Sequence, residues 1–285
     1  MSEPAVATPE VRQPSTAARI GRAIGNYGPF VYVFAAIAYL MLPVLVIALF
    51  SFNDPIGKSN LAWRGFTLKY WMDPFGVPGL GDAVVISIQL AILSTIIATT
   101  LGTLIALALV RHRFRGRGPT DAIIFLPMAT PEIVMGASLL TMFVAIARPP
   151  FFPLNFLTIL IAHIMFNISF VVVTVRARLA GLDKNLEEAA MDLGANEWTT
   201  FWRITFPLIL PGIMAAALLA FSLSIDDFVI TNFTAGRTVT FPMFIWGSAR
   251  IGVPVQVNVI GTMIFLIGIA FVVFSLVFQR RREAS

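Results

Sequence analysis

Long apolar runs with few or no charged residues dominate the chain. They lie at about residues 30–52, 83–110, 122–147, 152–175, 206–231 and 257–278, the third with Glu132 and the fifth with Asp226 and Asp227 inside it. Each run reaches the roughly 18 residues expected of a transmembrane helix. Inside lipid the backbone has to satisfy its own hydrogen bonds, which favours helices. The pattern therefore predicts an all-α membrane protein with six transmembrane helices.

The polar segments set the predicted boundaries. Residues 1–28 are expected to form an N-terminal tail with a short amphipathic helix around Ala17–Ile24. Residues 29–280 form the transmembrane domain, and residues 281–285 form a short tail. The loop at residues 176–205, between the fourth and fifth predicted spans, is the longest polar interruption on its side of the membrane.

The distribution of Lys and Arg residues predicts the orientation of the chain in the membrane. Fourteen of the 20 lie in the amino tail, in the loops after the second and fourth spans, and in the carboxyl tail. Because cytoplasmic loops carry an excess of these residues, both termini and the 176–205 loop are placed in the cytoplasm. The net charge of +5 thus follows membrane orientation, and no nucleic-acid partner is expected.

The amino-acid composition argues against several classes of protein. Only 12% of residues are charged, against about 25% in soluble domains. The chain has no cysteine, and its two histidines, His112 and His163, are far apart, so no metal site is expected. No internal repeat is visible, whereas secondary transporters usually contain paired or inverted repeats.

The 176–205 loop and the residues that follow it predict two short helices around a glycine. Asp183 or Asn185 can cap the first helix, and Gly194 ends it. The second helix begins near Asn196 and ends before Pro207. From these residues alone, both a partner-docking knob and a generic amphipathic loop stay open. The apolar positions at helical spacing are Leu186, Ala189, Ala190 and Leu193.

A longer motif in this loop resembles the EAA loop of ABC importer permeases. Glu188-Ala189-Ala190 is followed after three residues by Gly194, and after nine more by Ile204-x-Phe206-Pro207. Only Phe206 departs from the family pattern, which has leucine there. In that family the loop is the coupling helix that docks in a groove of the ATPase. The resemblance implies this role for Glu188, Ala189, Ala190 and Gly194.

The resemblance extends over about residues 30–278. Segments 113–116, 131–134, 170–175 and 222–228 are similar to the spermidine/putrescine branch, and the chain is similar to the second of its two permease subunits. This implies the type I importer permease fold in a bacterial inner membrane. It also implies an ATPase dimer, a second permease and an extracytoplasmic solute-binding protein as partners. Because the chain lacks a phosphate-binding loop, it is expected to be no enzyme and to bind no cofactor, while ATP and Mg²⁺ belong to the partner ATPases.

Three carboxylates inside the apolar runs are the candidates for a substrate path. Glu132, Asp226 and Asp227 would each cost roughly 2.5–3.5 kcal/mol at the bilayer centre, so they should face a cavity or a partner. A polyamine, as a flexible polycation, would be attracted to such groups.

A structural role for the same residues stays open. Glu132 follows Thr130-Pro131, which is typical of a helix start, and would then complement the helix dipole. Asp226 and Asp227 would cap a break in the fifth span or bond to the second subunit. His163, one helical turn from Asn167, is assigned a hydrogen-bonded packing role, with a proton relay as the alternative.

The predicted function is import of a small cation, a polyamine by resemblance, through alternating access driven by partner ATPases. Two other classes stay open: a secondary transporter that uses Asp226 and Asp227 as an ion site, and a non-transporting membrane scaffold or sensor that binds an ATPase. A different small solute, and a pore of identical or different permeases, are both compatible with the sequence.

Overall fold

A computed structural model of the chain describes residues 16–57, 59–112, 114–146, 153–183 and 185–283. In these ranges the fold is helical, and the single β-type pairing is an isolated bridge between Asn53 and Phe66. The long elements are α1 (Thr16–Phe50), α3 (Leu80–Arg111), α4 (Arg117–Ala129), α5 (Glu132–Ile146), α6 (Phe156–Ala180), α9 (Phe206–Asp226) and α12 (Val255–Glu283). The short elements are α2 (Lys69–Met72), α7 (Asn185–Asp192), α8 (Glu197–Thr200), the π-helical η1 (Phe201–Thr205), α10 (Val229–Thr234) and α11 (Phe241–Ala249).

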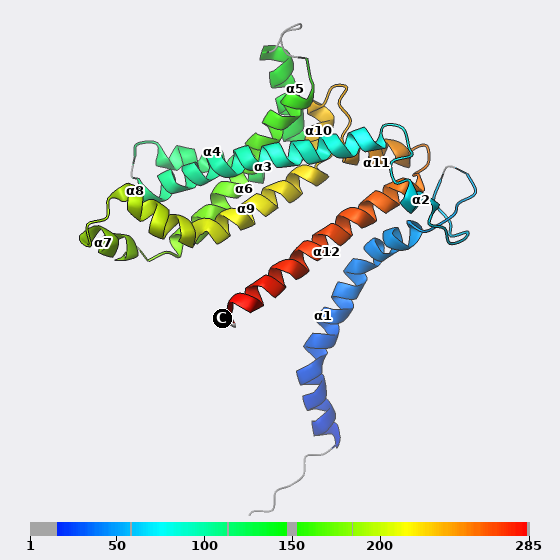
Figure 1. Cartoon of the computed structure of the whole chain (residues 1–285), viewed down its shortest axis with the longest axis horizontal. Coiled ribbons are helices and arrows are strands. Elements are labelled where there is room, and N and C mark those ends of the chain that lie inside the picture. Colours follow the sequence, from blue (N-terminus) through cyan, green and yellow to red (C-terminus); the bar gives the residue numbers. More distant parts are fainter. Residues whose placement is uncertain (1–15, 58, 113, 147–152, 184, 284–285) are drawn as a thin grey trace, which may run out of the picture.

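The centre of the molecule is a layer of three long helices, α3, α6 and α9, that lie side by side (Figure 1). Their contact is made by small and β-branched side chains, which let helix backbones approach closely inside a membrane. The α4 helix lies against α6 at the α7 end of this layer. The buried side chains of this core are Ala106, Leu109, Ile124, Val171, Val172, Val175, Leu179, Ile209, Ala216 and Ala220.

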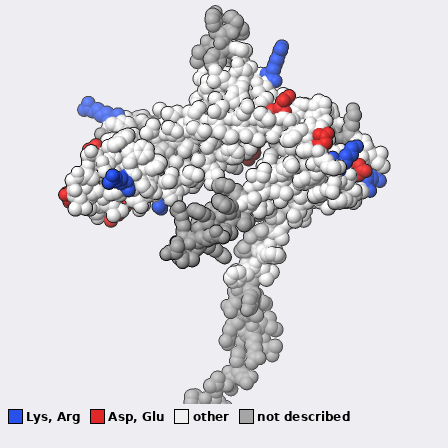
Figure 2. Space-filling view, viewed as in Figure 1, with Lys and Arg blue, Asp and Glu red and all other residues white. Residues whose placement is uncertain are grey.

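Four helical segments of the described residues are long and apolar enough to cross a membrane, and a fifth results if α4 and α5 form one bent span. The described apolar part of α12, Val255–Ala270, is shorter than this limit. Charged side chains gather at the two ends of the central layer, over α7 and over the loop between α1 and α2, and the surface between them is largely uncharged (Figure 2). The surface therefore has the polarity that a bilayer requires.

The third predicted span is not one helix. The α4 and α5 helices are bent by 111° with respect to each other, so the predicted run at 122–147 contains two helices, as the alternative of a restarted helix before Glu132 had it. The break lies at Thr130 and Pro131, because proline disfavours the helical conformation in the residue before it. The α5 helix then turns away from the layer and packs against α10 (Figure 1).

The fifth predicted span also differs from the expectation. Its helix ends at Asp226, Asp227 has extended backbone angles, and α10 begins at Val229. At the other end, α8, η1 and α9 form one continuous 30-residue helix, Glu197–Asp226. The second loop helix therefore does not end before Pro207, because the π-helical turn in front of this residue accommodates a proline that lacks an N–H donor.

The first and last helices lie outside the central layer. The α1 helix packs against α12, and both diverge from the layer in Figure 1. The helix begins at Thr16 and runs unbroken to Phe50, so residues 16–28 belong to α1 rather than to a tail with a separate short helix. Most side chains of α1 from Phe30 onward are exposed in the single chain, which is a surface suited to lipid or to another membrane subunit.

The close contact of α3 with α6 gives a stability prediction at Gly102. A Cβ atom there would lie 2.6 Å from Cγ1 of Val171, so Gly102→Ala should lower the free energy of unfolding by about 1–3 kcal/mol. Thermal unfolding of the detergent-solubilised protein measures this effect. Gly268→Ala is the matched control, because a Cβ at Gly268 meets no atom within 4 Å. If Gly102→Ala in combination with Val171→Ala is no more stable than Gly102→Ala alone, the steric explanation is refuted.

Candidate functional site

The start of α7 is fixed by an aspartate. Oδ1 of Asp183 accepts a hydrogen bond from the backbone N–H of Asn185 at 3.0 Å, and its carbonyl oxygen accepts from the N–H of Leu186. This geometry satisfies N–H groups that have no partner within the helix. Of the two residues predicted as caps, Asp183 has this role and Asn185 does not.

The end of α7 is fixed by Gly194, as predicted. Its φ of +89° is in the left-handed region that favours glycine. The N–H of Gly194 donates to the carbonyl of Met191 at 2.9 Å, and the N–H of Ala195 donates to that of Ala190 at 3.0 Å. These two bonds form a Schellman motif. Asn196 then accepts from the N–H of Thr199 at 2.8 Å and begins α8 at the predicted place.

The apolar side chains of α7 point in different directions. Ala190 is buried at 9% exposure, whereas Leu193 is 90% exposed. Leu186 and Ala189 are also exposed, so the predicted apolar face is mostly free in the single chain. A surface of this kind at the end of a membrane protein can dock a partner.

Three side chains attach α7 to the helical layer. Arg111, the last residue of α3, forms an ion pair with Glu187 and donates a second hydrogen bond, of 2.9 Å, to the hydroxyl of Thr205. That hydroxyl in turn donates to the carboxylate of Glu187. We call Arg111, Glu187 and Thr205 the α7 anchor. It joins α3, α7 and η1, and therefore connects the loop directly to the long helix that contains α9.

Two hollows flank the α7 anchor. A small one of about 230 Å³ lies between α7 and the ends of α3 and α6, with Leu179, Glu187 and Met191 in its lining. A larger one of about 740 Å³ lies between α3 and α8, with Leu104, Arg111 and Trp198 in its lining. Trp198 is 71% exposed. The loop thus presents both a protruding helix and apolar recesses beside it.

A second polar group of residues lies inside the helical layer, at the break between α9 and α10. His163 of α6 is 2% exposed. Its Nδ1 lies 2.7 Å from the hydroxyl of Ser224, and its Nε2 lies 2.9 Å from the hydroxyl of Thr231 and 3.3 Å from Oδ2 of Asp227. Ser94 of α3 extends the network with a 2.9 Å bond to Ser224. His163 therefore has the predicted packing role, but with these partners and not with Asn167.

The three predicted path residues lie in different surroundings. The Asp227 side chain is 7% exposed, and its carboxylate accepts bonds from the N–H and the hydroxyl of Thr231, both at 2.8 Å. Asp227 therefore caps α10. Asp226 and Glu132 are both exposed in the single chain. Glu132 begins α5, as expected of a helix start, but the Thr130 hydroxyl donates back to the Leu126 carbonyl at 2.7 Å and does not cap α5.

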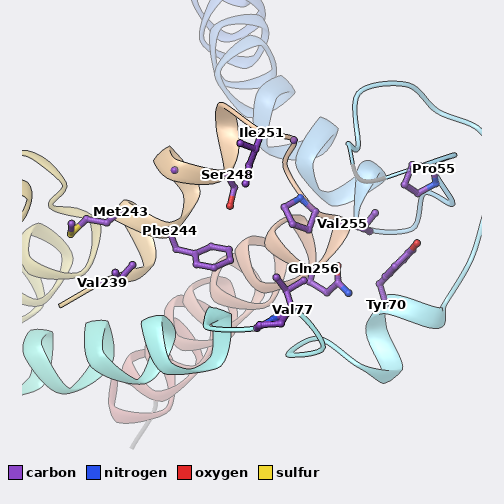
Figure 3. Close-up of a pocket in the computed structure, with 15 residues that line it drawn as sticks. Pro55, Tyr70, Val77, Val239, Met243, Phe244, Ser248, Ile251, Val255 and Gln256 are labelled. Carbon is purple, nitrogen blue, oxygen red and sulfur yellow. The ribbon is translucent and has the colours of Figure 1, made fainter. Parts of the chain in front are cut away.

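A cavity of about 770 Å³ lies at the opposite end of the layer, between α2, α11 and α12. Figure 3 shows Tyr70, Phe244, Ser248 and Gln256 around it. Its lining contains neither a carboxylate nor a Lys or Arg side chain within the described part of the chain. The acidic residues of the fifth span do not belong to this cavity.

Comparison with known proteins identifies the class. Residues 98–283 match the family of binding-protein-dependent transport system inner membrane components, and the chain belongs to this family. It is 35% identical over 253 residues to the spermidine/putrescine transport system permease protein PotC of Haemophilus influenzae, which covers 88% of this chain and 96% of the relative. It is 38% identical over 230 residues to the putrescine transport system permease protein PotI of Escherichia coli, which covers 79% of this chain and 81% of the relative.

Solved structures show the same fold at low identity. A chain of a bacterial ABC transporter that imports alginate aligns with a TM-score of 0.67 at 16% identity, over 92% of this chain and 99% of that one. A chain of the MetNI methionine ABC transporter aligns with a TM-score of 0.53 at 14% identity, over 69% and 90%. The predicted type I importer permease fold and multi-pass inner-membrane class are confirmed, and the chain is a transport component rather than an enzyme.

The α7 anchor was missed at the sequence level. Arg111 is 76 residues from Glu187 and 94 from Thr205, so no local spacing connects them. The motif pointed to Glu188, the exposed neighbour, whereas Glu187 is the side chain that turns inward. In the sequence, the contact was indicated only by Arg111 at the end of the second apolar run, because a cation at the C-terminal end of a helix can pair with an acidic residue of a nearby loop.

We expect Glu187→Gln to loosen α7 without unfolding the protein. Arg111 and Glu187 are 33% and 29% exposed, so their pair should contribute at most about 1 kcal/mol. Backbone hydrogen exchange of α7, measured by mass spectrometry, should then accelerate about fivefold. Glu188→Gln makes the same chemical change at an exposed neighbour and should leave exchange unchanged. Equal exchange in both variants would show that the anchor does not hold α7.

Proposed function

We propose that this chain is a permease subunit that carries a polyamine, of the spermidine or putrescine class, into the cytoplasm. The observation that supports it most directly is the extent of similarity to PotC, 35% identity over 88% of the chain and 96% of the relative. A relative named for putrescine transport is similarly close. The exposed carboxylates of the membrane region suit a cationic solute, because opposite charges attract strongly where water is scarce.

The energy for transport enters through the α7 loop in this proposal. Glu188, Ala189 and Gly194, which are exposed, form the contact with an ATPase subunit, and Ala190, which is buried, supports α7 from the inner side. Support comes from the free apolar side chains of α7, the recesses beside it, and the α7 anchor. Displacement of α7 would move the end of α3 and the long helix that contains α9, because Arg111 and Thr205 both bond to Glu187.

The other partners follow from the same class of importer. A second permease would complete the pore and cover the exposed sides of the helical layer, and a solute-binding protein would deliver the polyamine from outside. ATP and Mg²⁺ would bind to the ATPase subunits. The Lys and Arg distribution, which places α7 in the cytoplasm, is consistent with this arrangement.

The substrate path is proposed to include Asp226 and Glu132. Both carboxylates are exposed in the single chain, which leaves them free to face a passage between two permeases. Asp227 has its carboxylate bonded to Thr231 and near His163, so we assign it to holding the break between α9 and α10. Adjacent aspartates thus have different functions.

Uptake by the complete complex in proteoliposomes tests the proposed function. Labelled spermidine or putrescine should accumulate when ATP is enclosed with the ATPase subunits, and should not accumulate without ATP. Ionophores that remove ion gradients should leave uptake unchanged. Uptake that follows an ion gradient and survives ATP removal would instead show a secondary transporter, and an intact complex that carries neither polyamine would exclude this substrate class.

Gly194→Asp should weaken attachment of the ATPase. The change adds a negative charge at the end of α7, where the helix dipole and a close contact both disfavour it. We expect at least about a tenfold loss of affinity, measured by co-purification and by substrate-stimulated ATP hydrolysis. Gly194→Asn is the control, since asparagine is isosteric, uncharged and tolerates a positive φ. Unchanged ATPase stimulation in Gly194→Asp would refute docking at this glycine.

A further inference from the structure

The break between α9 and α10 gives two adjacent aspartates opposite surroundings. Asp226, the last residue of α9, is exposed, while the side chain of Asp227 is 7% exposed. Successive residues of a continuous helix point about 100° apart, and the extended backbone at Asp227 replaces that geometry with a fixed turn. Asp226 lies in the last turn of α9, so its direction depends on how that turn is held at the junction with α10.

His163 bonds to both sides of this turn. Through Nδ1 it contacts Ser224, two residues before the end of α9, and through Nε2 it contacts Thr231 of α10. It belongs to α6, which packs against α3, α9 and α10, so its ring is held by a separate helix. A single side chain thus connects the two helices across their break and ties both to the central layer.

The hydrogen-bond partners determine which ring nitrogen carries the proton. The hydroxyl of Thr231 donates to Oδ2 of Asp227, so towards the ring it can only accept, and Nε2 of His163 donates to it. Nδ1 then accepts from the hydroxyl of Ser224, and Ser224 accepts from Ser94. In this arrangement every polar group of the cluster has a partner, which a buried network in a membrane requires.

We propose that His163 is a positioning residue for translocation: by bridging Ser224 and Thr231 it fixes the break between α9 and α10 and holds Asp226 towards the substrate path. The proposal rests on the proposed function for the role of Asp226, while the geometry that it describes does not depend on the substrate. His163 itself touches no substrate, because it is buried at 2% exposure.

Substitutions at residue 163 distinguish the hydrogen bonds of His163 to Ser224 and Thr231 from the packing of its side chain. In His163→Gln the amide oxygen can accept from Ser224 and the amide NH₂ can donate to Thr231, so the bridge is kept without an imidazole. His163→Leu fills the space but makes neither bond. If folding of His163→Leu fails, Thr231→Val removes the Thr231 side of the bridge together with the hydroxyl bond to Asp227, while the backbone bond from Thr231 to Asp227 remains. Its control is Thr234→Val, since among the described residues the Thr234 hydroxyl bonds only to the Ile230 carbonyl of its own helix.

Cysteine labelling measures the direction of residue 226 directly, because the chain has no cysteine of its own. Asp226→Cys is introduced into the full complex in membranes, with residue 163 as His, Gln or Leu, and labelled with a charged methanethiosulfonate. We expect equal rates for His and Gln and a rate at least about fivefold lower for Leu, since two buried hydrogen bonds are lost. Ser222→Cys, exposed one turn earlier on α9, should label equally in all three backgrounds.

Several results would overturn the proposal. Equal labelling of Asp226→Cys in all three backgrounds would show that His163 does not set this direction. A Gln variant that behaves like Leu would show that the bridging bonds are not responsible. A parallel change at Ser222→Cys would show that α9 as a whole had moved.

A transport measurement then connects the geometry to function. His163→Leu should raise the KM for polyamine uptake several-fold, about as much as Asp226→Asn does, and should add little in the Asp226→Asn background. Additive effects of the two changes would indicate a general structural role and would refute positioning. If the complex carries no polyamine but the labelling pattern holds, the proposed substrate is wrong while the position of Asp226 remains set by His163.

Discussion

The break between α9 and α10 is stabilised by one buried network, and the arrangement of the acidic residues depends on it. In a membrane interior, burying an N–H, hydroxyl or carboxylate without a hydrogen-bond partner costs on the order of several kcal/mol, because water is absent. Interrupting a helix there exposes such groups. Asp227 satisfies the first N–H groups of α10, and His163 joins both sides of the break. The interruption persists because these polar groups satisfy one another.

The small residues of the central layer have a complementary role. Gly102 allows α3 to approach Val171 of α6 so closely that a methyl group would not fit between them. Gly212 similarly allows α9 to approach Arg178, whose side chain donates to the Leu208 carbonyl at 3.0 Å. Close backbone contact makes α3, α6 and α9 one unit, since lipid tails provide no hydrophobic driving force between helices. The polar cluster, with residues from these three helices and from α10, can then be held with little freedom of movement.

The sequence was a good guide to local features and a poor guide to those that depend on tertiary contacts. Apolar runs predicted α1, α3 and α6 because length and hydropathy are properties of a single segment. The caps at Asp183, Gly194 and Asn196 were also predictable, as each depends on a few neighbouring residues. The contact between Asp227 and His163 could not be predicted, because it joins residues that are far apart in the sequence. Spacing placed His163 one helical turn from Asn167 but named no partner for it, and the structure gives the side-chain amide of Asn167 no partner among the described residues.

The sequence was also a poor guide to the places where helices break. Hydropathy averages over a window and does not distinguish a straight span from two helices at 111°. Pro131 marked the first break, while Pro207 marked none, since a π-helical turn at Phe201–Thr205 accommodates it. A proline therefore indicates where a helix can break, and the surrounding contacts decide whether it does.

The unbroken helix from Glu197 to Asp226 relates the two polar sites to each other. At about 1.5 Å per residue, its 30 residues extend roughly 45 Å. Thr205 of the α7 anchor lies in the first third of this helix, and the helix ends at Asp226, next to the network of His163. A stiff helix transmits displacement along its length, so a movement of α7 towards or away from the membrane has to be absorbed where the helix ends. The break at Asp227 is that place, because beyond it α10 packs against α5 and α6. The α7 anchor near one end and the held break at the other are thus the two fixed points of a single element, which is the geometry that the proposed coupling through α7 would require.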